Sequence, residues 1–174
     1  FLMQSFFLIL TGMAIGTILL VVSKLMLEYR QVITAKILSL MLLSAACYMV
    51  QPLVREMYYL QFFVGVAAMA NPALFWMFAS TLFQMGEKNQ KLHLGHYIGL
   101  GVCIVIGTYH CLQSPADLES SIIHIVSLIA TGVLTVLGLF DVFRNWQSDL
   151  VECRRFLRLG LSGTSGAFLL FIVV

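Results

Sequence analysis

The sequence predicts an all-α protein, a polytopic transmembrane helix bundle that forms a single domain over residues 1–174. Hydrophobic residues make up 60% of the chain and charged residues only 10%, against about a quarter in a typical soluble domain. The mean hydropathy is +0.97. Because so little polar surface cannot cover a soluble globule of this length, we expect the chain to lie in a lipid bilayer.

Long apolar runs predict how often the chain crosses the bilayer. A spanning helix needs roughly 20 mostly apolar residues, whereas the strands of a membrane β-barrel alternate in polarity over about 10 residues. The runs in this sequence are long and continuously apolar, as in spanning helices. We expect six spans, at about residues 4–23, 32–50, 58–83, 97–112, 122–143 and 156–174.

The connections between these runs are short and polar. Residues 51–57 form a tight turn with Pro52, while residues 84–96 and 113–121 have the composition of ordinary loops. Since no linker-like stretch separates the spans, we expect one domain. The first residue is Phe1 and the last apolar run stops at Val174 without a polar flank, so we expect a piece of a longer chain.

The distribution of basic residues predicts the orientation. Nine of the ten Lys and Arg residues lie in or beside the first, third and fifth connections, and the other two connections contain only Arg55. Lys and Arg favour cytoplasmic loops near the ends of spans. We therefore expect the amino terminus outside and residues 144–158 in the cytoplasm.

The third span contains an Asn-Pro pair in its middle. Pro72 lacks a backbone donor and clashes with the preceding turn, so we expect a kink or break there. Asn71 then either bonds a neighbouring helix or helps to line a binding site built on the freed backbone groups. Trp76, one turn further, is either a packed aromatic residue or part of the same cavity.

Polar residues near the outer ends of the spans form a second group of candidates. With Asn71 and Trp76 they are the candidate ligand-binding residues, for a small-molecule signal of unknown identity. Tyr side chains also occur at membrane interfaces because the ring is amphipathic, so an interfacial belt is the alternative. The outer candidates are Gln51, Tyr58, Gln61, Tyr109, His110 and His124.

Asp141 is the acid that lies within an apolar run, near the inner end of the fifth span. Arg144 follows it at helical spacing, and we expect these two residues to form a structural pair. His93 and His96 are three residues apart in a predicted loop without further metal ligands. The sequence contains no catalytic motif and no C-x-x-C spacing. We therefore expect no enzymatic activity, no cofactor and no metal.

Small residues predict close helix contacts. Gly12 and Gly16 are four apart in the first span, and Gly95 and Gly99 repeat this spacing at the start of the fourth. Such pairs allow backbones to approach closely. The partner is either a helix of the same bundle or a second copy of the chain in a homodimer.

The stretch "DLVECRRFLR", residues 149–158, gathers five of the eighteen charged side chains between two apolar runs. A cytoplasmic anchor explains the basic residues. The alternation of sign at helical spacing also fits a short surface helix that couples the membrane domain to a partner. The candidate coupling residues are Asp149, Glu152, Arg154, Arg155 and Arg158.

Two segments resemble a bacterial family of transcription regulators. "NPALFWMFASTLF" (71–83) is similar to an Asn-Pro-x-Leu-Phe-Trp stretch in the third span of these proteins, matching at Asn71, Pro72, Leu74, Phe75 and Trp76. "DLVECRRFLR" is similar to the segment that follows their fifth span, matching at Asp149, Leu150, Val151, Glu152, Arg154, Arg155, Leu157 and Arg158. The family combines a multi-span membrane domain with a carboxy-terminal AraC-type helix-turn-helix domain.

The resemblance implies a signal-sensing membrane domain in the bacterial inner membrane, with DNA bound only through a carboxy-terminal domain that this sequence does not contain. A cytoplasmic DNA-binding domain would require a seventh span after Val174, because six spans return the chain to the outside. The alternative from the residues alone is a small-molecule transporter or channel subunit, and an integral membrane enzyme fits least.

Overall fold

The computed structural model describes residues 2–54, 56–83, 92–112 and 118–144, together with Gly160 and Gly163. The described part is helical and contains no strand, as the composition predicts. Its helices are α1 (Leu2–Glu28), α2 (Ile33–Val50), α3 (Tyr58–Met69), α4 (Asn71–Phe83), α5 (Leu94–Leu112) and α6 (Leu118–Phe143).

Five helical stretches are long and apolar enough to cross a membrane, and α3 with α4 forms one of them. These five agree with the first five predicted spans. The sixth, at residues 156–174, lies outside the described residues apart from Gly160 and Gly163, and so does the sequence "DLVECRRFLR". The surface of the bundle carries many exposed Leu, Ile, Val and Phe side chains, as expected for a surface that faces lipid.

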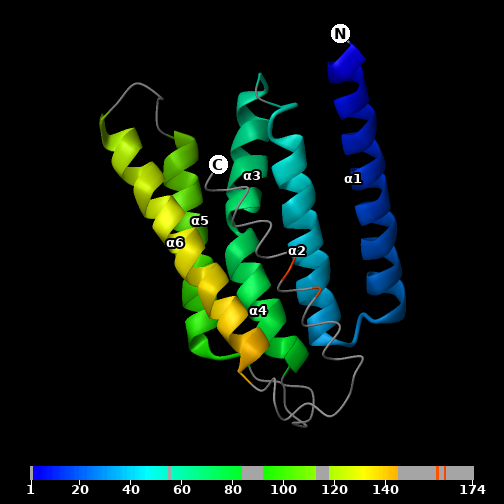
Figure 1. Ribbon diagram of the computed structural model, residues 1–174, viewed down its shortest axis with the longest axis vertical. Coiled ribbons are helices and arrows are strands. Elements are labelled where there is room, and N and C mark those ends of the chain that lie inside the picture. The colour runs from blue at the N-terminus through cyan, green and yellow to red at the C-terminus, as the bar shows by residue number, and fades with distance from the viewer. Residues whose placement is uncertain are drawn as a thin grey trace.

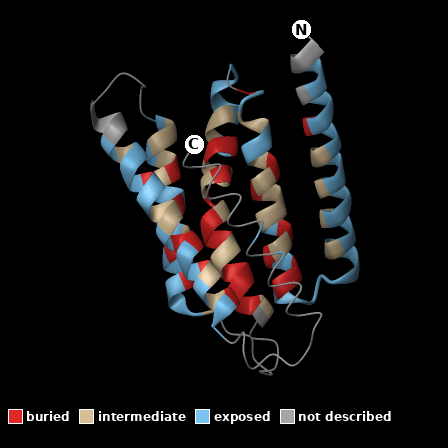
Figure 2. Cartoon of the chain, viewed as in Figure 1, coloured by how far each residue is buried: buried red, intermediate tan, exposed pale blue. Residues whose placement is uncertain are grey.

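The helices run up and down side by side (Figure 1). Of the described helices, α1 packs against α2 alone, and α2 packs on its other side against α3 and α4. The paired α5 and α6 complete the bundle, with α3 against α5 and α4 mainly against α6. The span made of α3 and α4 is therefore central, and Figure 2 shows buried residues concentrated along it.

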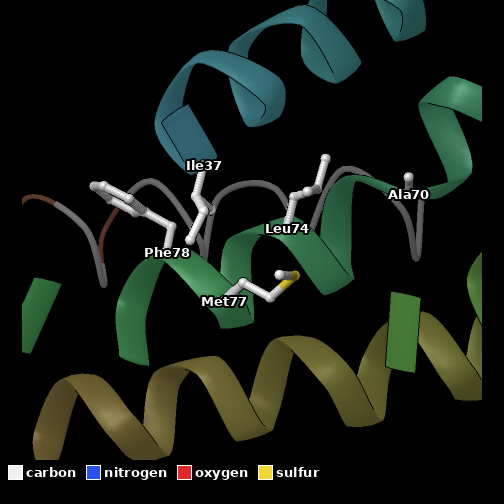
Figure 3. Close-up of a cluster of buried hydrophobic side chains, with 5 residues drawn as sticks. All are labelled: Ile37, Ala70, Leu74, Met77 and Phe78. Atoms are coloured by element: carbon white, nitrogen blue, oxygen red, sulfur yellow. The ribbon is translucent and has the colours of Figure 1, made fainter. Parts of the chain in front are cut away.

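The core lies on α4. One cluster joins Ile37 of α2 to Ala70, Leu74, Met77 and Phe78 (Figure 3). On another side of α4, Ala73 packs with Cys103 of α5 and Leu134 of α6. Because α4 buries side chains against three helices, most of its polar side chains depend on partners inside the bundle.

The third span is interrupted where the Asn-Pro pair predicts. Helix α3 ends at Met69, Ala70 forms a turn and α4 starts at Asn71. Pro72 has no N–H to continue the ladder of helical hydrogen bonds. Just before it, the Ala70 N–H bonds the carbonyl of Ala67, three residues back, as in a tight turn. The Ser44 hydroxyl of α2 also donates to the Ala67 carbonyl, at 2.7 Å. A neighbouring helix thus supplies part of the hydrogen bonding that the break disrupts.

Three helix ends differ from the prediction by three or more residues, and one of them is the start of α6, at Leu118 rather than at residue 122. Helix α1 continues to Glu28, beyond the expected end at residue 23, because the residues that follow are good helix formers. Helix α5 begins at Leu94 rather than at residue 97. The carbonyl of His93 accepts the backbone N–H of His96 at 3.0 Å and starts the first turn. His96, which was expected in a loop, consequently belongs to a helix.

Candidate functional site

A polar network of buried and partly buried side chains joins α4, α5 and α6 at the end of the bundle where α6 stops, the lower end in Figure 1. Its first link connects the indole N–H of Trp76 on α4 with Oδ2 of Asp141 on α6, at 3.0 Å. Ser80, one turn after Trp76, also bonds Oδ2 of Asp141 through its hydroxyl. The spacing of four residues on α4 therefore places two donors against one carboxylate.

The second link connects α4 with the start of α5. Nε2 of His96 lies 2.8 Å from Oγ of Ser80. The other ring nitrogen, Nδ1, lies 3.2 Å from the backbone carbonyl of His93. Only 4% of the His96 surface and 4% of the Ser80 surface is exposed, so water does not compete freely for these groups.

Trp76 lies against both neighbouring helices. Its ring and the His96 ring are tilted, with centroids 4.3 Å apart. A Cβ added at Gly99 of α5 would lie 3.3 Å from Cζ3 of Trp76, and one added at Gly138 of α6 would lie 3.3 Å from its Cα. Gly99 lets α5 approach the indole ring, and Gly138 lets α6 approach the backbone of α4 at Trp76, so both helices pack closely around the residue that donates to Asp141.

The Gly95–Gly99 pair therefore makes a contact within the bundle, since a Cβ at Gly95 would lie 3.8 Å from Cη2 of Trp76. The Gly12–Gly16 pair of α1 does not, because a Cβ added at either position would meet nothing within 4 Å in the described part of the chain.

Asp141 does not pair with Arg144, although the helical spacing of the two residues predicts such a pair. Both residues are described, and no ion pair forms between them; Arg144 is exposed after the last turn of α6. Asp141 is partly buried and accepts hydrogen bonds from α4. A carboxylate at this depth is better satisfied by fixed donors inside the bundle than by a solvated cation at its end.

The candidate ligand-binding residues do not gather at one place. Trp76 belongs to the network just described, while Asn71 lies at the break between α3 and α4. Oδ1 of Asn71 is buried and has no hydrogen-bond partner. The hydrogen bond to an adjacent helix that we considered for Asn71 is thus not made by this oxygen.

The outer candidates lie at the opposite end of the bundle. His110 of α5 and His124 of α6 face each other, with ring centroids 6.3 Å apart. Tyr58 and Tyr109 are exposed, and no hydrogen bond or ring contact joins them to this histidine pair in the described structure. Gln51 caps α2 and Gln61 is partly buried in α3. These residues thus form a His110–His124 pair rather than one complete pocket.

The cysteines, and the other residue types that commonly bind metals, form no further site within the described residues. Cys47, Cys103 and Cys111 are free thiols. No group of three or more His, Cys, Asp or Glu side chains there is arranged to hold a metal ion.

The sequence points to Trp76 and Asp141 as candidates but not to Ser80 and His96. Ser80 could have been found as the polar residue one turn from Trp76 on the same face. His96 could not, because residues 84–96 have the composition of a loop and the contact depends on how α5 packs against α4.

The order of groups differs from that of a Ser-His-Asp catalytic triad. In a triad the carboxylate bonds the ring nitrogen that faces away from the serine. Here Ser80 lies between His96 and Asp141, and the far nitrogen of His96 faces a backbone carbonyl. This arrangement suits proton sharing and helix attachment, and it does not prepare a nucleophile.

No protein-family model, curated protein or solved structure matches the chain. The similarity to AraC-type regulators consequently rests on the two sequence segments.

Proposed function

We propose that the chain is the signal-sensing transmembrane domain of an AraC-type transcription regulator in the bacterial inner membrane. The amino terminus lies outside, and DNA is bound by a carboxy-terminal domain that follows this segment of the chain. The signal is a small molecule, and the coupling residues are Asp149, Glu152, Arg154, Arg155 and Arg158.

One observation supports this proposal most directly. Trp76 lies in the first family-like segment, and its indole bonds Asp141 on the helix that leads to the second. Asp141 precedes Asp149 by eight residues. A movement of α4 caused by a ligand can therefore reach the coupling segment through the Trp76–Asp141 hydrogen bond and the end of α6. The broken third span, with the unpaired Oδ1 of Asn71, offers a place where such a movement can start.

The experiment uses the full-length protein in its own cells. The protein is crosslinked to DNA and recovered, and the bound DNA is sequenced. We expect this DNA to come from a small set of promoter sites. Deleting the gene should change transcription from those promoters. A reading frame that stops shortly after Val174, or recovery of DNA no higher than from a tagged membrane protein of unrelated function, would contradict the proposal.

A small-molecule transporter is the second candidate, and the hydrogen-bonded chain of Asp141, Ser80 and His96 inside the bundle favours it. Ionisable side chains inside membrane proteins commonly mark proton relays in transporters. Transport predicts substrate accumulation in proteoliposomes that depends on a proton gradient. A sensor predicts no such accumulation but a promoter response in the cell, so the two assays separate the candidates.

A further inference from the structure

We infer that Ser80, His96 and Asp141 form a proton-binding site, in which one bound proton attaches the start of α5 to α4 and α6. The inference follows from hydrogen-bond donors and acceptors and does not rest on the proposed function.

Ser80 is the limiting donor. Its Oγ contacts Oδ2 of Asp141 and Nε2 of His96, yet a hydroxyl carries a single hydrogen. Each contact needs its own hydrogen, so Asp141 or His96 must supply the second. Oδ2 of Asp141 already accepts the indole N–H of Trp76, which supplies no proton to Ser80.

His96 cannot satisfy both contacts in its neutral form without help from Asp141. Nδ1 faces the carbonyl of His93, which can only accept, so this nitrogen carries a hydrogen. In neutral imidazole Nε2 is then a bare acceptor. Nε2 takes the single hydrogen of Ser80, and the contact of Ser80 with Asp141 requires a protonated carboxyl group.

Two arrangements satisfy every contact. In the first, Asp141 is a carboxylic acid that donates to Ser80, and Ser80 donates to neutral His96. In the second, imidazolium His96 donates to Ser80, and Ser80 donates to carboxylate Asp141. They interconvert when both hydrogens move one place along the chain of bonds. Both hold one proton more than a carboxylate with a neutral imidazole, and both are neutral overall.

The arrangement without this proton is disfavoured. Carboxylate Asp141 and neutral His96 then both accept, and Ser80 can donate its single hydrogen to only one of them. In the other contact, a lone pair of the Ser80 oxygen faces a lone pair of the second acceptor. The site would also carry a net negative charge among apolar helices, where an unpaired charge is costly. Charge-assisted hydrogen bonds are the stronger ones, so Ser80 would stay with Asp141 and the bond to His96 would be lost. Proton loss therefore releases α5 and keeps α4 attached to α6.

The surrounding charged groups do not replace this proton. Asp141 and His93 are the groups that act electrostatically on His96, and the His93 ring stacks on it with centroids 6.1 Å apart. The next charged residue after Asp141 is Arg144, just past the end of α6, and α2 carries Lys36; both are exposed. Helix α4 contains no acidic or basic residue. No basic side chain in the described stretches forms an ion pair with Asp141.

The test is nuclear magnetic resonance on the full chain in lipid nanodiscs, with nitrogen-15 in the histidine rings and carbon-13 in the aspartate carboxyls. His96→Gln and Asp141→Asn assign the two signals. At neutral pH we expect either a carboxylic acid at Asp141 with His96 protonated on Nδ1 alone, or a carboxylate with His96 protonated on both nitrogens. A carboxylate together with a neutral His96 ring would overturn the inference.

Asp141→Asn gives a second measurement. In the place of Oδ2, an amide NH2 donates to Ser80 as the carboxylic acid does, and the bond from Trp76 is lost, because Oδ2 makes both contacts. We expect His96 in this variant to be protonated on Nδ1 alone at neutral pH and to stay so under mildly acidic conditions. A ring protonated on both nitrogens in the variant would contradict the shared site. The wild-type measurement decides the question even if the variant does not fold.

Discussion

The indole N–H of Trp76 on α4 donates a 3.0 Å hydrogen bond to Asp141 on α6, across 65 residues of sequence. The bond connects the central, broken span with the helix that leads toward the charged segment at residues 149–158. A change in this contact should therefore alter how the central span and α6 move together.

Trp76→Phe should weaken this link and leave an aromatic ring in place. We expect a loss of stability of about 0.6–2 kcal/mol, the range of hydrogen bonds between membrane helices, because Asp141 keeps the bond from Ser80. Thermal unfolding of the purified protein in detergent measures the loss.

Tyr58→Phe is the matched control for Trp76→Phe. It removes one polar group from an exposed aromatic side chain at the other end of the bundle, and it should leave the unfolding temperature unchanged. Equal effects of the two substitutions would show that the Trp76–Asp141 bond contributes nothing measurable.

Gly138 and Gly132 of α6 allow a paired test of helix packing. A Cβ at Gly138 would lie 2.6 Å from Cε1 of Phe75 and 3.3 Å from Cα of Trp76, whereas one at Gly132 would meet nothing within 4 Å. Gly138→Ala should therefore cost about 1–3 kcal/mol through overpacking. Gly132→Ala should be neutral or stabilise by up to about 1 kcal/mol, because alanine favours helix. Unfolding midpoints of the two variants, measured side by side, should differ in this order; the reverse order would contradict the packing of α6 on α4.

The break in the third span predicts an unequal effect of two buried serines on α2. Ser44 donates to the Ala67 carbonyl across the helix interface, whereas Ser39 donates to Ala35 within its own helix. Ser44→Ala should destabilise the protein by about 0.6–2 kcal/mol, since it removes a donor that no other residue of α2 replaces. Ser39→Ala should have the smaller effect, because the Ala35 carbonyl keeps its helical partner. Unfolding in detergent compares them, and a larger loss for Ser39→Ala would count against this role of Ser44.

The sequence predicts those features that depend on local chemistry. Apolar runs locate five spans, and Pro72 locates the break because a missing N–H acts wherever it occurs. The partner of Asp141 depends instead on tertiary packing. Arg144 was the nearest complementary charge along the chain, yet Trp76 and Ser80 satisfy the carboxylate from a helix far away in sequence.

The position of His96 also depends on tertiary packing that the sequence does not show. The polar composition before it indicates a loop, and the helix begins three residues earlier because His93 starts the first turn. The contact with Ser80 then requires α4 and α5 to lie at a particular rotation about their axes. Sequence spacing within one helix carries no information on that rotation.

The orientation is tested by labelling single cysteines in intact cells, on a background without the four native cysteines. A membrane-impermeant thiol reagent should label Ser120→Cys, which lies in the first turn of α6 beside the second connection that we expect outside. It should not label Asn89→Cys or Ser148→Cys, because the basic residues predict a cytoplasmic location for those connections. Permeabilised cells serve as the control, since all three positions should then react. The opposite pattern in intact cells would reverse the predicted orientation.

The charged segment is tested by a change that keeps its charge. Two readings of Arg154, Arg155 and Arg158 are anchoring to lipid phosphates, to which each basic residue contributes about 1 kcal/mol, and binding to carboxylates of a cytoplasmic partner domain. Lysine preserves the anchor but cannot reproduce the bidentate geometry of arginine. We expect the triple Arg→Lys variant of the full-length protein to insert normally and to lose most of its promoter response.

A matched triple Arg→Gln variant separates geometry from charge in the same assay. It removes the basic anchor as well, so it should disturb insertion or orientation in the cysteine-labelling experiment, which the triple Lys variant should not. An unchanged promoter response in the Lys variant would show that the segment serves only as a membrane anchor. A lost response with normal labelling would instead assign it a contact that depends on the shape of the guanidinium group, because charge and membrane position are then both intact.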